Sequence, residues 1–373
     1  MVTIRILHIL PSMNRGGAEN AIMNYYREID KSLIQFDFLL TDSSPCDFEE
    51  EIMSLGGKIF RIRPLQLHNP IPYIIDVYKF LKGHKEYKIV HSHTSSKSVL
   101  PLSIAKLLKV PVRISHSHNS KSEKGISGII RNLLKPFLGI SANVYMACGE
   151  QAAIWLYGKS FTNKGKVEII RNVISAQKFR YNKNVRATIR QRFGVSDDTI
   201  IIGHVARMCH VKNHRFGLDI LKELLEISPN IVYMIVGEGP EKDNLEKYAK
   251  QIKVDYAVKM VGLVDNVYDY EQAFDVFILP SYYEGLPLSI IEAQVSGLPC
   301  FTTKYTVSTE CSVTDLVHYL PLSLGPKMWA KEIWSHTKYR RIDRYEEIKS
   351  GGYDAHTSSR ILQEKYLYFA SKV

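Results

Sequence analysis

The chain alternates short apolar runs with longer amphipathic stretches along its whole length. In the first half, the apolar runs predict buried strands, and stretches with apolar residues three and four positions apart predict helices. Strands are expected at residues 3–10, 36–40, 58–61, 89–93, 111–115 and 144–147, and helices after residue 17 and at 47–55, 72–84 and 98–108. Such regular alternation is typical of a doubly wound parallel sheet.

The same pattern starts again in the second half, with strands expected at 200–206, 233–236, 258–262, 275–279 and 299–302. A chain of 373 residues exceeds what one core usually holds, so two domains are expected, at 1–172 and 173–355. The last helix, expected at 358–370, has no place in the second sheet, so residues 356–373 are expected to pack on the first domain. The fold class is therefore α/β, with two Rossmann-like sheets facing each other across a cleft.

In such sheets, ligands bind beyond the carboxyl ends of the strands. Four histidines of the first half follow strands in this way: His91, His93, His116 and His118. Gly16 and Gly17 stand between a strand and a helix, where glycine lets backbone amides approach a phosphate or a sugar. A bare pair of glycines also fits a simple tight turn.

Four strand ends of the second half are expected to converge on one rim, at 207–212, 237–239, 262–265 and 284–292. Arg207 and Lys212, beside the free amides of a helix that begins near Leu286, are what a diphosphate needs. Glu292 can accept hydrogen bonds from ribose hydroxyls, and Glu284 can hold hydroxyls of a transferred group. A solvent-facing helix glutamate remains the simpler interpretation of Glu292 taken alone.

Several segments resemble one family of enzymes. In chain order they read H-V-A-R-M-C-H-V-K-N-H, I-V-G-E-G-P, M-V-G-L-V-D-N-V and Y-Y-E-G-L-P-L-S-I-I-E-A-Q-V-S-G-L-P. They resemble the retaining, nucleotide-sugar-dependent glycosyltransferases of the GT-B fold, the large fourth family that includes bacterial capsule and exopolysaccharide enzymes. The family's strongest mark is a pair of glutamates eight positions apart, here Glu284 and Glu292. P-S-M-N-R-G-G-A-E-N resembles its first glycine loop, so the resemblance covers nearly the whole chain.

The resemblance implies a donor site in the second domain. Arg207 and Lys212 would hold the diphosphate of a nucleotide sugar, with UDP favoured, and Glu292 would bind the ribose. The other implied donor contacts are Gly16, Gly17, Gly237, Leu263, Val264, Gly285, Leu286, Pro287 and Leu288. No metal or other cofactor is expected, because the basic pair and the helix amides replace it.

The resemblance also implies catalytic residues. Glu284 would contact the transferred sugar, as would a histidine of the first domain, where His118 is favoured over His116. Since no nucleophile can be placed under the anomeric carbon, a front-side path is expected, in which the leaving phosphate helps to deprotonate the acceptor. Two departures from the family pattern are Asn172-Val173 and the stretch V-S-T-E-C-S-V-T-D after the second glutamate's strand.

The net charge of +11 is explained either by an anionic partner or by basic faces that are exposed to solvent. Residues 121–140 combine helical apolar spacing with lysine and arginine, so they fit an anionic membrane surface or a core-facing helix with a basic outer face. Five scattered cysteines predict a reduced, cytoplasmic chain without structural zinc or disulfides. No membrane span or signal peptide is expected, and no nucleic-acid motif is found.

The sequence therefore predicts a retaining hexosyltransferase that moves a sugar from a nucleotide diphosphate sugar to a glycan, lipid-linked, in surface polysaccharide biosynthesis. It is expected in the cytoplasm, with peripheral attachment to the inner face of the cell membrane. Two alternatives stay open at this point: a non-catalytic nucleotide-sugar-binding protein, and a sugar-nucleotide epimerase on the same fold.

Overall fold

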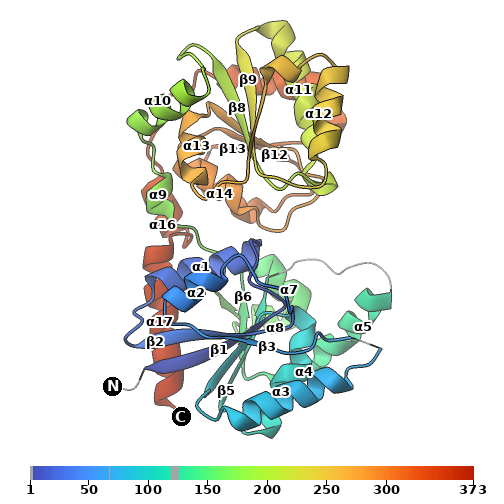
Figure 1. The fold of residues 1–373 in the computed structure, drawn as a ribbon, viewed down its shortest axis with the longest axis vertical. Helices are drawn as coiled ribbons and strands as arrows, with labels where there is room; N and C mark the ends of the chain where they lie inside the picture. The colour runs from blue at the N-terminus through green and yellow to red at the C-terminus, as the bar shows by residue number, and fades with distance from the viewer. Residues whose placement is uncertain (1–2, 67, 119–125) are drawn as a thin grey trace. The chain divides into compact units, whose positions relative to one another are not determined.

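The computed structural model describes residues 3–66, 68–118 and 126–373 of the chain. They divide into two compact units, the first from Met1 to Val173 together with Ala355–Val373, and the second from Ile174 to Asp354. Each unit is an α/β domain built on its own parallel sheet, and the colours of Figure 1 separate the two along the chain. The predicted fold class is therefore confirmed.

Unit 1 holds a seven-stranded parallel sheet in the order β3-β2-β1-β4-β5-β6-β7. Its strands are β1 (Ile4–Leu10), β2 (Ile34–Leu40), β3 (Ile59–Arg61), β4 (Ile89–Ser92), β5 (Val112–Ser117), β6 (Val144–Ala147) and β7 (Glu168–Ile169). The central strands are buried along most of their length, as a sheet covered on both faces requires. The reversal of strand order between β1 and β4 is where such sheets place their ligands.

Helices follow the strands of unit 1. They are α1 (Gly17–Glu28), α2 (Glu49–Ser54), α3 (Ile71–Gly83), η1 (Ser95–Ser98), α4 (Val99–Leu107), α5 (Ile126–Leu134), η2 (Lys135–Phe137), α6 (Leu138–Ser141), α7 (Glu150–Tyr157) and α8 (Lys159–Asn163). The last helix of the chain, α17 (Ala355–Ser371), packs against α1 in this unit. Its Leu362 and Tyr366 are buried in one core with Tyr26 and Phe36.

Unit 2 holds a six-stranded parallel sheet in the order β10-β9-β8-β11-β12-β13. Its strands are β8 (Ile200–Val205), β9 (Ile231–Val236), β10 (Val258–Gly262), β11 (Val276–Leu279), β12 (Cys300–Thr303) and β13 (Val317–Leu320). Its helices are α9 (Ala176–Phe179), α10 (Lys183–Arg192), η3 (His210–Lys212), α11 (His214–Ile227), α12 (Lys242–Gln251), η4 (Asp255–Ala257), α13 (Val267–Ala273), α14 (Leu288–Val295), η5 (Thr309–Cys311), η6 (Leu322–Leu324), α15 (Gly325–His336) and α16 (Tyr345–Ser350). The order again reverses between β8 and β11, which brings the loops after these two strands to the same edge.

Candidate active site

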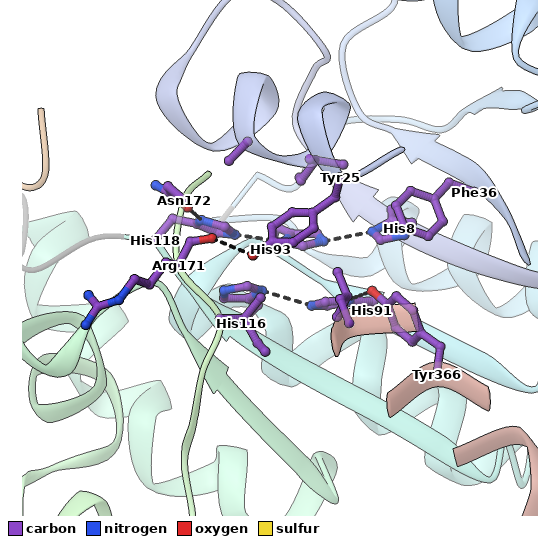
Figure 2. Close-up of a pocket in the computed structure, with 14 residues that line it drawn as sticks. His8, Tyr25, Phe36, His91, His93, His116, His118, Arg171, Asn172 and Tyr366 are labelled. Carbon is purple, nitrogen blue, oxygen red and sulfur yellow. Dashed lines mark hydrogen bonds between the residues drawn. The ribbon is translucent and has the colours of Figure 1, made fainter. Parts of the chain in front are cut away.

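Unit 1 gathers five histidines on its central strands (Figure 2). His8 lies in β1, His91 in β4 and His116 in β5, while His93 and His118 directly follow β4 and β5. Because β1, β4 and β5 are neighbours in the sheet, these side chains meet above one stretch of it. The four histidines predicted at strand ends therefore come together, and His8, which the sequence analysis did not single out, joins them.

The five rings form two hydrogen-bonded rows (Figure 2). We call the first the asparagine row. It begins at Asn172, whose Oδ1 lies 3.1 Å from Nδ1 of His118. Nε2 of His118 lies 2.8 Å from Nδ1 of His93, and Nε2 of His93 lies 2.9 Å from Nδ1 of His8. We call the second the tyrosine row: the Tyr366 hydroxyl lies 2.7 Å from Nδ1 of His91, whose Nε2 is 3.1 Å from Nδ1 of His116.

The two rows stack ring on ring. His91 lies over His93 and His116 over His118, each pair with ring centroids 4.1 Å apart. Burial lowers the pKa of all five rings, to about 3 for His8 and to about 4 for His118, and neighbouring rings lower the others further. The array is therefore uncharged at neutral pH, because a proton added to one ring would sit in a poorly solvated cluster of others.

The array forms one wall of a small pocket. Tyr25, whose hydroxyl donates to the Arg171 carbonyl at 2.8 Å, and Tyr366 line the same pocket. Its accessible surface is almost entirely apolar, because most ring nitrogens of the array are hydrogen-bonded to one another.

The glycine loop of unit 1 lies against the side chain of Glu19. A Cβ on Gly16 would lie 2.2 Å from Oε2 of Glu19, whereas a Cβ on Gly17 would meet nothing within 4 Å. Gly16 precedes α1 as its N-cap in an extended conformation, and burial raises the pKa of Glu19. A side chain at position 16 would therefore displace the flexible end of Glu19, and the extended backbone does not itself require glycine there.

In unit 2, the loop between β11 and α14 is held by an ion pair. Nζ of Lys212 lies 2.6 Å from Oε1 of Glu284, and the same oxygen accepts a hydrogen bond from the Ser281 hydroxyl at 2.7 Å. The Glu284 side chain is mostly buried and that of Lys212 is about a quarter exposed. Two residues predicted from separate motifs therefore meet at one point of the sheet edge.

Asn213 ties the loops after β8 and β11 together. It adopts the left-handed conformation (φ 55°, ψ 43°), and its Nδ2 donates to the Pro280 carbonyl at 3.0 Å. The Tyr282 amide donates to the Val211 carbonyl at 2.9 Å. Asparagine tolerates the left-handed region better than most residues, so it can give both the turn and the side-chain bond.

The loop after β9 packs directly onto the loop after β8. A Cβ on Gly237, at φ 134°, would lie 2.2 Å from the Ala206 carbonyl oxygen, and one on Gly239 would lie 2.3 Å from that of Met208. The Gly237 amide donates to the Gly262 carbonyl at 2.9 Å, which adds the loop after β10. The four strand ends predicted to converge do so, through close glycine approaches between the loops after β8 and β9 and through Lys212 and Asn213 at the loop after β11.

Glu292 in α14 lies close enough to Glu271 of α13 for the two carboxyl groups to influence each other. Desolvation raises the pKa of Glu292 to about 7. Desolvation, and then the charge of Glu292, raises the pKa of Glu271, although the Ser296 hydroxyl donates to its Oε2 at 3.1 Å. Near neutral pH, Glu292 is thus partly protonated and can donate as well as accept a hydrogen bond.

The remaining predicted donor residues differ in exposure. Arg207 is exposed, and Leu263 is 62% exposed. Three others, Val264, Leu286 and Leu288, are partly buried and pack against the core of unit 2. Their side chains are therefore used in packing, so a ligand would meet mainly their backbone.

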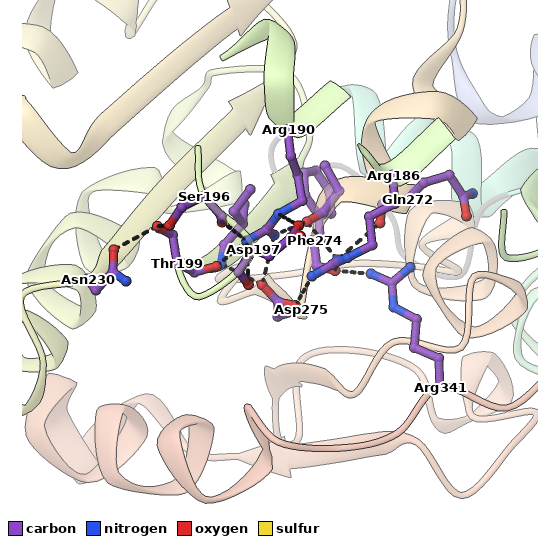
Figure 3. A network of polar contacts seen from close by, with 12 residues as sticks. Arg186, Arg190, Ser196, Asp197, Thr199, Asn230, Gln272, Phe274, Asp275 and Arg341 are labelled. Atoms are coloured by element: carbon purple, nitrogen blue, oxygen red, sulfur yellow. Dashed lines mark hydrogen bonds and ion pairs between the residues drawn. The ribbon is translucent and has the colours of Figure 1, made fainter. Parts of the chain in front are cut away.

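A buried arginine network supports β11 from its amino end (Figure 3). Arg190, only 1% exposed, donates to the carbonyls of Ala273 and Ser196, and Arg186 pairs with Asp275 at 2.6 Å. Asp275 also accepts from the Ile201 amide at 2.8 Å, which joins β8 to the start of β11. These two arginines of α10 are therefore used in contacts inside unit 2.

Comparison with known proteins identifies the family to which this chain belongs. The family described as "Glycosyl transferases group 1" matches residues 185–317. EpsF of Bacillus subtilis (strain 168), provisionally named a glycosyltransferase, is 35% identical over 368 residues, which are 97% of this chain and 96% of EpsF. The chain belongs to the glycosyl transferases group 1 family. It is therefore a glycosyltransferase, as its sequence motifs predict.

Two further relatives of this glycosyltransferase are more distant. The capsular polysaccharide biosynthesis glycosyltransferase CapH of Staphylococcus aureus is 27% identical, over 98% of this chain and 99% of CapH. An Escherichia coli enzyme named UDP-Gal:alpha-D-GlcNAc-diphosphoundecaprenol alpha-1,3-galactosyltransferase is 23% identical, over 80% of this chain and 79% of its own.

Among solved structures, Anabaena Alr3699/HepE in complex with UDP-glucose superposes with a TM-score of 0.71 at 17% identity, over 99% of this chain and 100% of HepE. At this identity the likeness concerns the fold. The resemblance to the GT-B glycosyltransferases noted in the sequence is thereby confirmed at the level of the family and the fold.

Proposed function

We propose that this glycosyltransferase moves a sugar from a UDP-sugar to a lipid-linked glycan, with retention of the anomeric configuration. It acts in polysaccharide biosynthesis, as the name of its CapH relative indicates. The observation that carries the donor half is the convergence in unit 2 of Lys212, Glu284 and the amino end of α14.

The donor site follows from charge and hydrogen-bonding capacity. Lys212 and the exposed Arg207 supply positive charge for a diphosphate, and the first amides of α14 add donors. Glu292, partly protonated at neutral pH, suits a ribose diol because it can both donate and accept. The UDP-glucose complex of the HepE neighbour supports UDP as the nucleotide.

The proposed transfer occurs on one face of the sugar. The acceptor oxygen forms its bond to the anomeric carbon as the bond from that carbon to the leaving phosphate oxygen breaks, and the phosphate takes the hydroxyl proton. Positive charge at Lys212 and Arg207 stabilises the diphosphate as it gains negative charge. NMR of the product tests the stereochemistry, since an inverted anomeric centre would contradict this path.

A thermal-shift panel tests the donor. UDP and UDP-sugars are expected to raise the melting temperature more than GDP, ADP or their sugars, because a ligand of the folded state stabilises it. Lys212→Ala should abolish the shift, whereas Lys259→Ala, on β10, should retain it. An equal response to all nucleotides, or a shift unchanged in Lys212→Ala, would contradict this donor site.

The lipid-linked acceptor is supported by an apolar patch on unit 1. Along α5, η2 and α6, outward-facing Ile129, Leu133, Phe137 and Ile140 are 62%, 66%, 54% and 62% exposed, while Leu138 is buried. The segment thus has apolar residues on both its buried and its exposed face. A core-facing helix with a basic outer face, the alternative considered from the sequence, would have them on the buried face alone. An anionic membrane surface would cover such a patch.

Basic groups surround this apolar patch. Nζ of Lys106 donates to the Ile140 carbonyl at 2.9 Å, next to exposed Leu107, and Lys109 is exposed as well. Among the described residues, no helix is long and apolar enough to cross a membrane. We therefore propose peripheral attachment through these side chains, toward the diphosphoundecaprenol type of acceptor that the Escherichia coli relative's name specifies.

Vesicle sedimentation tests the membrane part. The enzyme is expected to sediment with phosphatidylglycerol vesicles at low salt and less with phosphatidylcholine vesicles. Leu133→Ser with Phe137→Ser should weaken sedimentation, whereas Ile227→Ser, exposed on α11, should not. If wild type stays in the supernatant with anionic vesicles, the membrane surface is excluded while the donor assignment stands.

A further inference from the structure

Tyr305 combines an exposed aromatic ring with an unfavourable backbone conformation. It lies in the loop between β12 and η5 and is 84% exposed. Its φ is 72°, and among the described residues other than glycine with a positive φ it is the only aromatic one. The left-handed region is unfavourable for a bulky side chain, and so exposed a residue gains little from packing that would offset the cost. Residues held in such conformations cluster at functional sites.

The loop that carries Tyr305 is tied to the loop that carries Glu284. The Glu284 amide donates to the Thr306 carbonyl at 3.0 Å, and the Thr306 hydroxyl donates to the Ser281 carbonyl at 3.4 Å. On the other side of Tyr305, the Lys304 amide donates to the carbonyl of the last residue of β13 at 3.0 Å. Both chain neighbours of Tyr305 are therefore fixed by hydrogen bonds, which hold its backbone conformation in place beside Glu284.

A second exposed tyrosine lies in the neighbouring loop. Tyr282 is 46% exposed, and its ring centroid lies 5.0 Å from that of His210, an exposed residue in the loop after β8. The loops after β8, β11 and β12 thus each present an exposed ring at the carboxyl edge of unit 2. The negative face of an aromatic ring attracts the slightly positive C–H groups on the flat side of a sugar. This edge therefore has the chemistry of a surface that binds a glycan.

The strand order separates Tyr305 from the expected position of the nucleobase. Leu263 follows β10 at one side of the sheet, and Tyr305 follows β12 near the other. With neighbouring strands about 4.8 Å apart, β10 and β12 lie roughly 19 Å apart. Between them come Lys212 after β8, proposed for the diphosphate, and Glu284 after β11, proposed for the transferred sugar. The next loop along this edge is therefore the one beside the transferred sugar, on the side away from the nucleobase.

We propose that Tyr305, together with Tyr282, binds the terminal sugar ring of the acceptor glycan and is a specificity-determining residue for the acceptor. An acceptor hydroxyl must come within about 3–3.5 Å of the anomeric carbon to react, so the terminal sugar of the acceptor lies next to the transferred sugar. This proposal rests on the proposed function, because it needs Glu284 to hold the transferred sugar. Tyr305 supplies an aromatic face for the acceptor sugar and does not take part in the bond changes.

Saturation-transfer NMR tests the contact, with a panel of bacterial surface oligosaccharides as probes and UDP present. Wild type is expected to transfer saturation to the ring C–H protons of at least one oligosaccharide. Tyr305→Leu, which keeps an apolar side chain without an aromatic face, should lower that signal about tenfold, and Tyr305→Phe should retain it. Tyr256→Leu, at a tyrosine that is 70% exposed in η4, is the matched control. No signal in wild type, or an equal signal in Tyr305→Leu, would overturn the proposal.

The thermal shift with UDP separates failure of this contact from failure of the donor site. UDP should raise the melting temperature of wild type and Tyr305→Leu equally, because the proposed contact is with the acceptor. A normal UDP shift with undiminished oligosaccharide binding in Tyr305→Leu would remove Tyr305 and leave the donor site standing. A UDP shift that is lost in Tyr305→Leu would mean that the ring contacts the donor, and would overturn the acceptor role. Absence of the shift in wild type would contradict the donor site and this proposal with it.

The backbone conformation gives an independent measurement. Tyr305→Gly should raise the melting temperature by about 2–4 °C, because glycine adopts a φ of 72° without strain, and it should lose the oligosaccharide signal. Tyr305→Leu keeps the strain and should melt close to wild type. Weaker binding in a variant that melts higher cannot result from misfolding. A lower melting temperature in Tyr305→Gly would mean that the residue serves the fold, and would overturn its assignment to a ligand.

Discussion

The two units bring opposite kinds of polar group to the same place in the same type of sheet. Unit 1 buries five imidazoles that stay neutral because a proton would be poorly solvated among them. Unit 2 places the ion pair of Lys212 and Glu284 and the carboxyl group of Glu292 at its strand ends. One edge is thus uncharged and the other carries charged side chains, and the predictions below test that contrast.

The largest effect is expected at the charged edge. Glu284→Ala should lower kcat/KM about 10²-fold or more, because it removes the proposed contact to the sugar and leaves Lys212 without its partner. Glu226→Ala, which changes an exposed glutamate of α11, is the matched control and should leave transfer unchanged. Equal activity of Glu284→Ala and wild type would remove the ion pair from the donor site.

Acid should unfold unit 1 before unit 2. Its five histidines have a folded pKa below their ordinary value of 6.5, so the unfolded chain binds more protons, and stability is lost as pH falls below 6.5. Unit 2 has two such buried histidines, His204 and His214. Hydrogen exchange at pH 7 and pH 5 should show this order, and earlier opening of unit 2 would contradict it.

Alkaline pH should act in the opposite direction on unit 2. The folded pKa of Glu292 is about 7 and that of Glu271 is also raised, so the folded state keeps protons that the unfolded chain has lost, and stability falls as pH rises from about 4.5 to 7. Glu271→Gln should therefore stabilise the enzyme by about 1 kcal/mol or more at pH 8 and little at pH 5. Thermal unfolding at the two pH values, with Glu226→Gln as control, measures the difference. A gain of equal size at both would exclude the raised pKa as its cause.

A smaller effect is expected at Asn213. Asn213→Ala should cost about 1–2 kcal/mol of stability, since it loses the bond to the Pro280 carbonyl and puts alanine in the left-handed region. Asn213→Gly loses the bond but not the backbone conformation, so its loss should be smaller. Denaturant unfolding compares the two, and a larger loss in the glycine variant would mean that the backbone conformation is not the cause.

The sequence predicted most strands and the two-sheet fold, because buried parallel strands have short, uninterrupted apolar runs. It did not predict α10, where eight of ten residues are not buried, and the helix is anchored by the charged side chains of Arg186 and Arg190. Apolar periodicity cannot find a helix held by buried arginines. The roles of the predicted site residues toward a ligand stay predictions.

The parts of the site that sequence reasoning missed depend on long-range contacts. His8 stands in an apolar strand, where a single histidine gives no signal, and it matters through His93, 85 positions away. Tyr366 reaches His91 across 275 positions of sequence. Such pairs follow from the strand order β1-β4-β5 and from the return of α17, which no local pattern contains.

The return of α17 to unit 1 also constrains how the chain can fold during its synthesis. Unit 2 is one continuous segment, but unit 1 needs Leu362 and Tyr366 from the last helix to complete its core. As the chain leaves the ribosome, the amino-terminal unit therefore stays incomplete while the later one can already close. A premature stop before α17 would leave a folded unit 2 joined to an incomplete unit 1, whose exposed apolar surface chaperones or proteases would recognise.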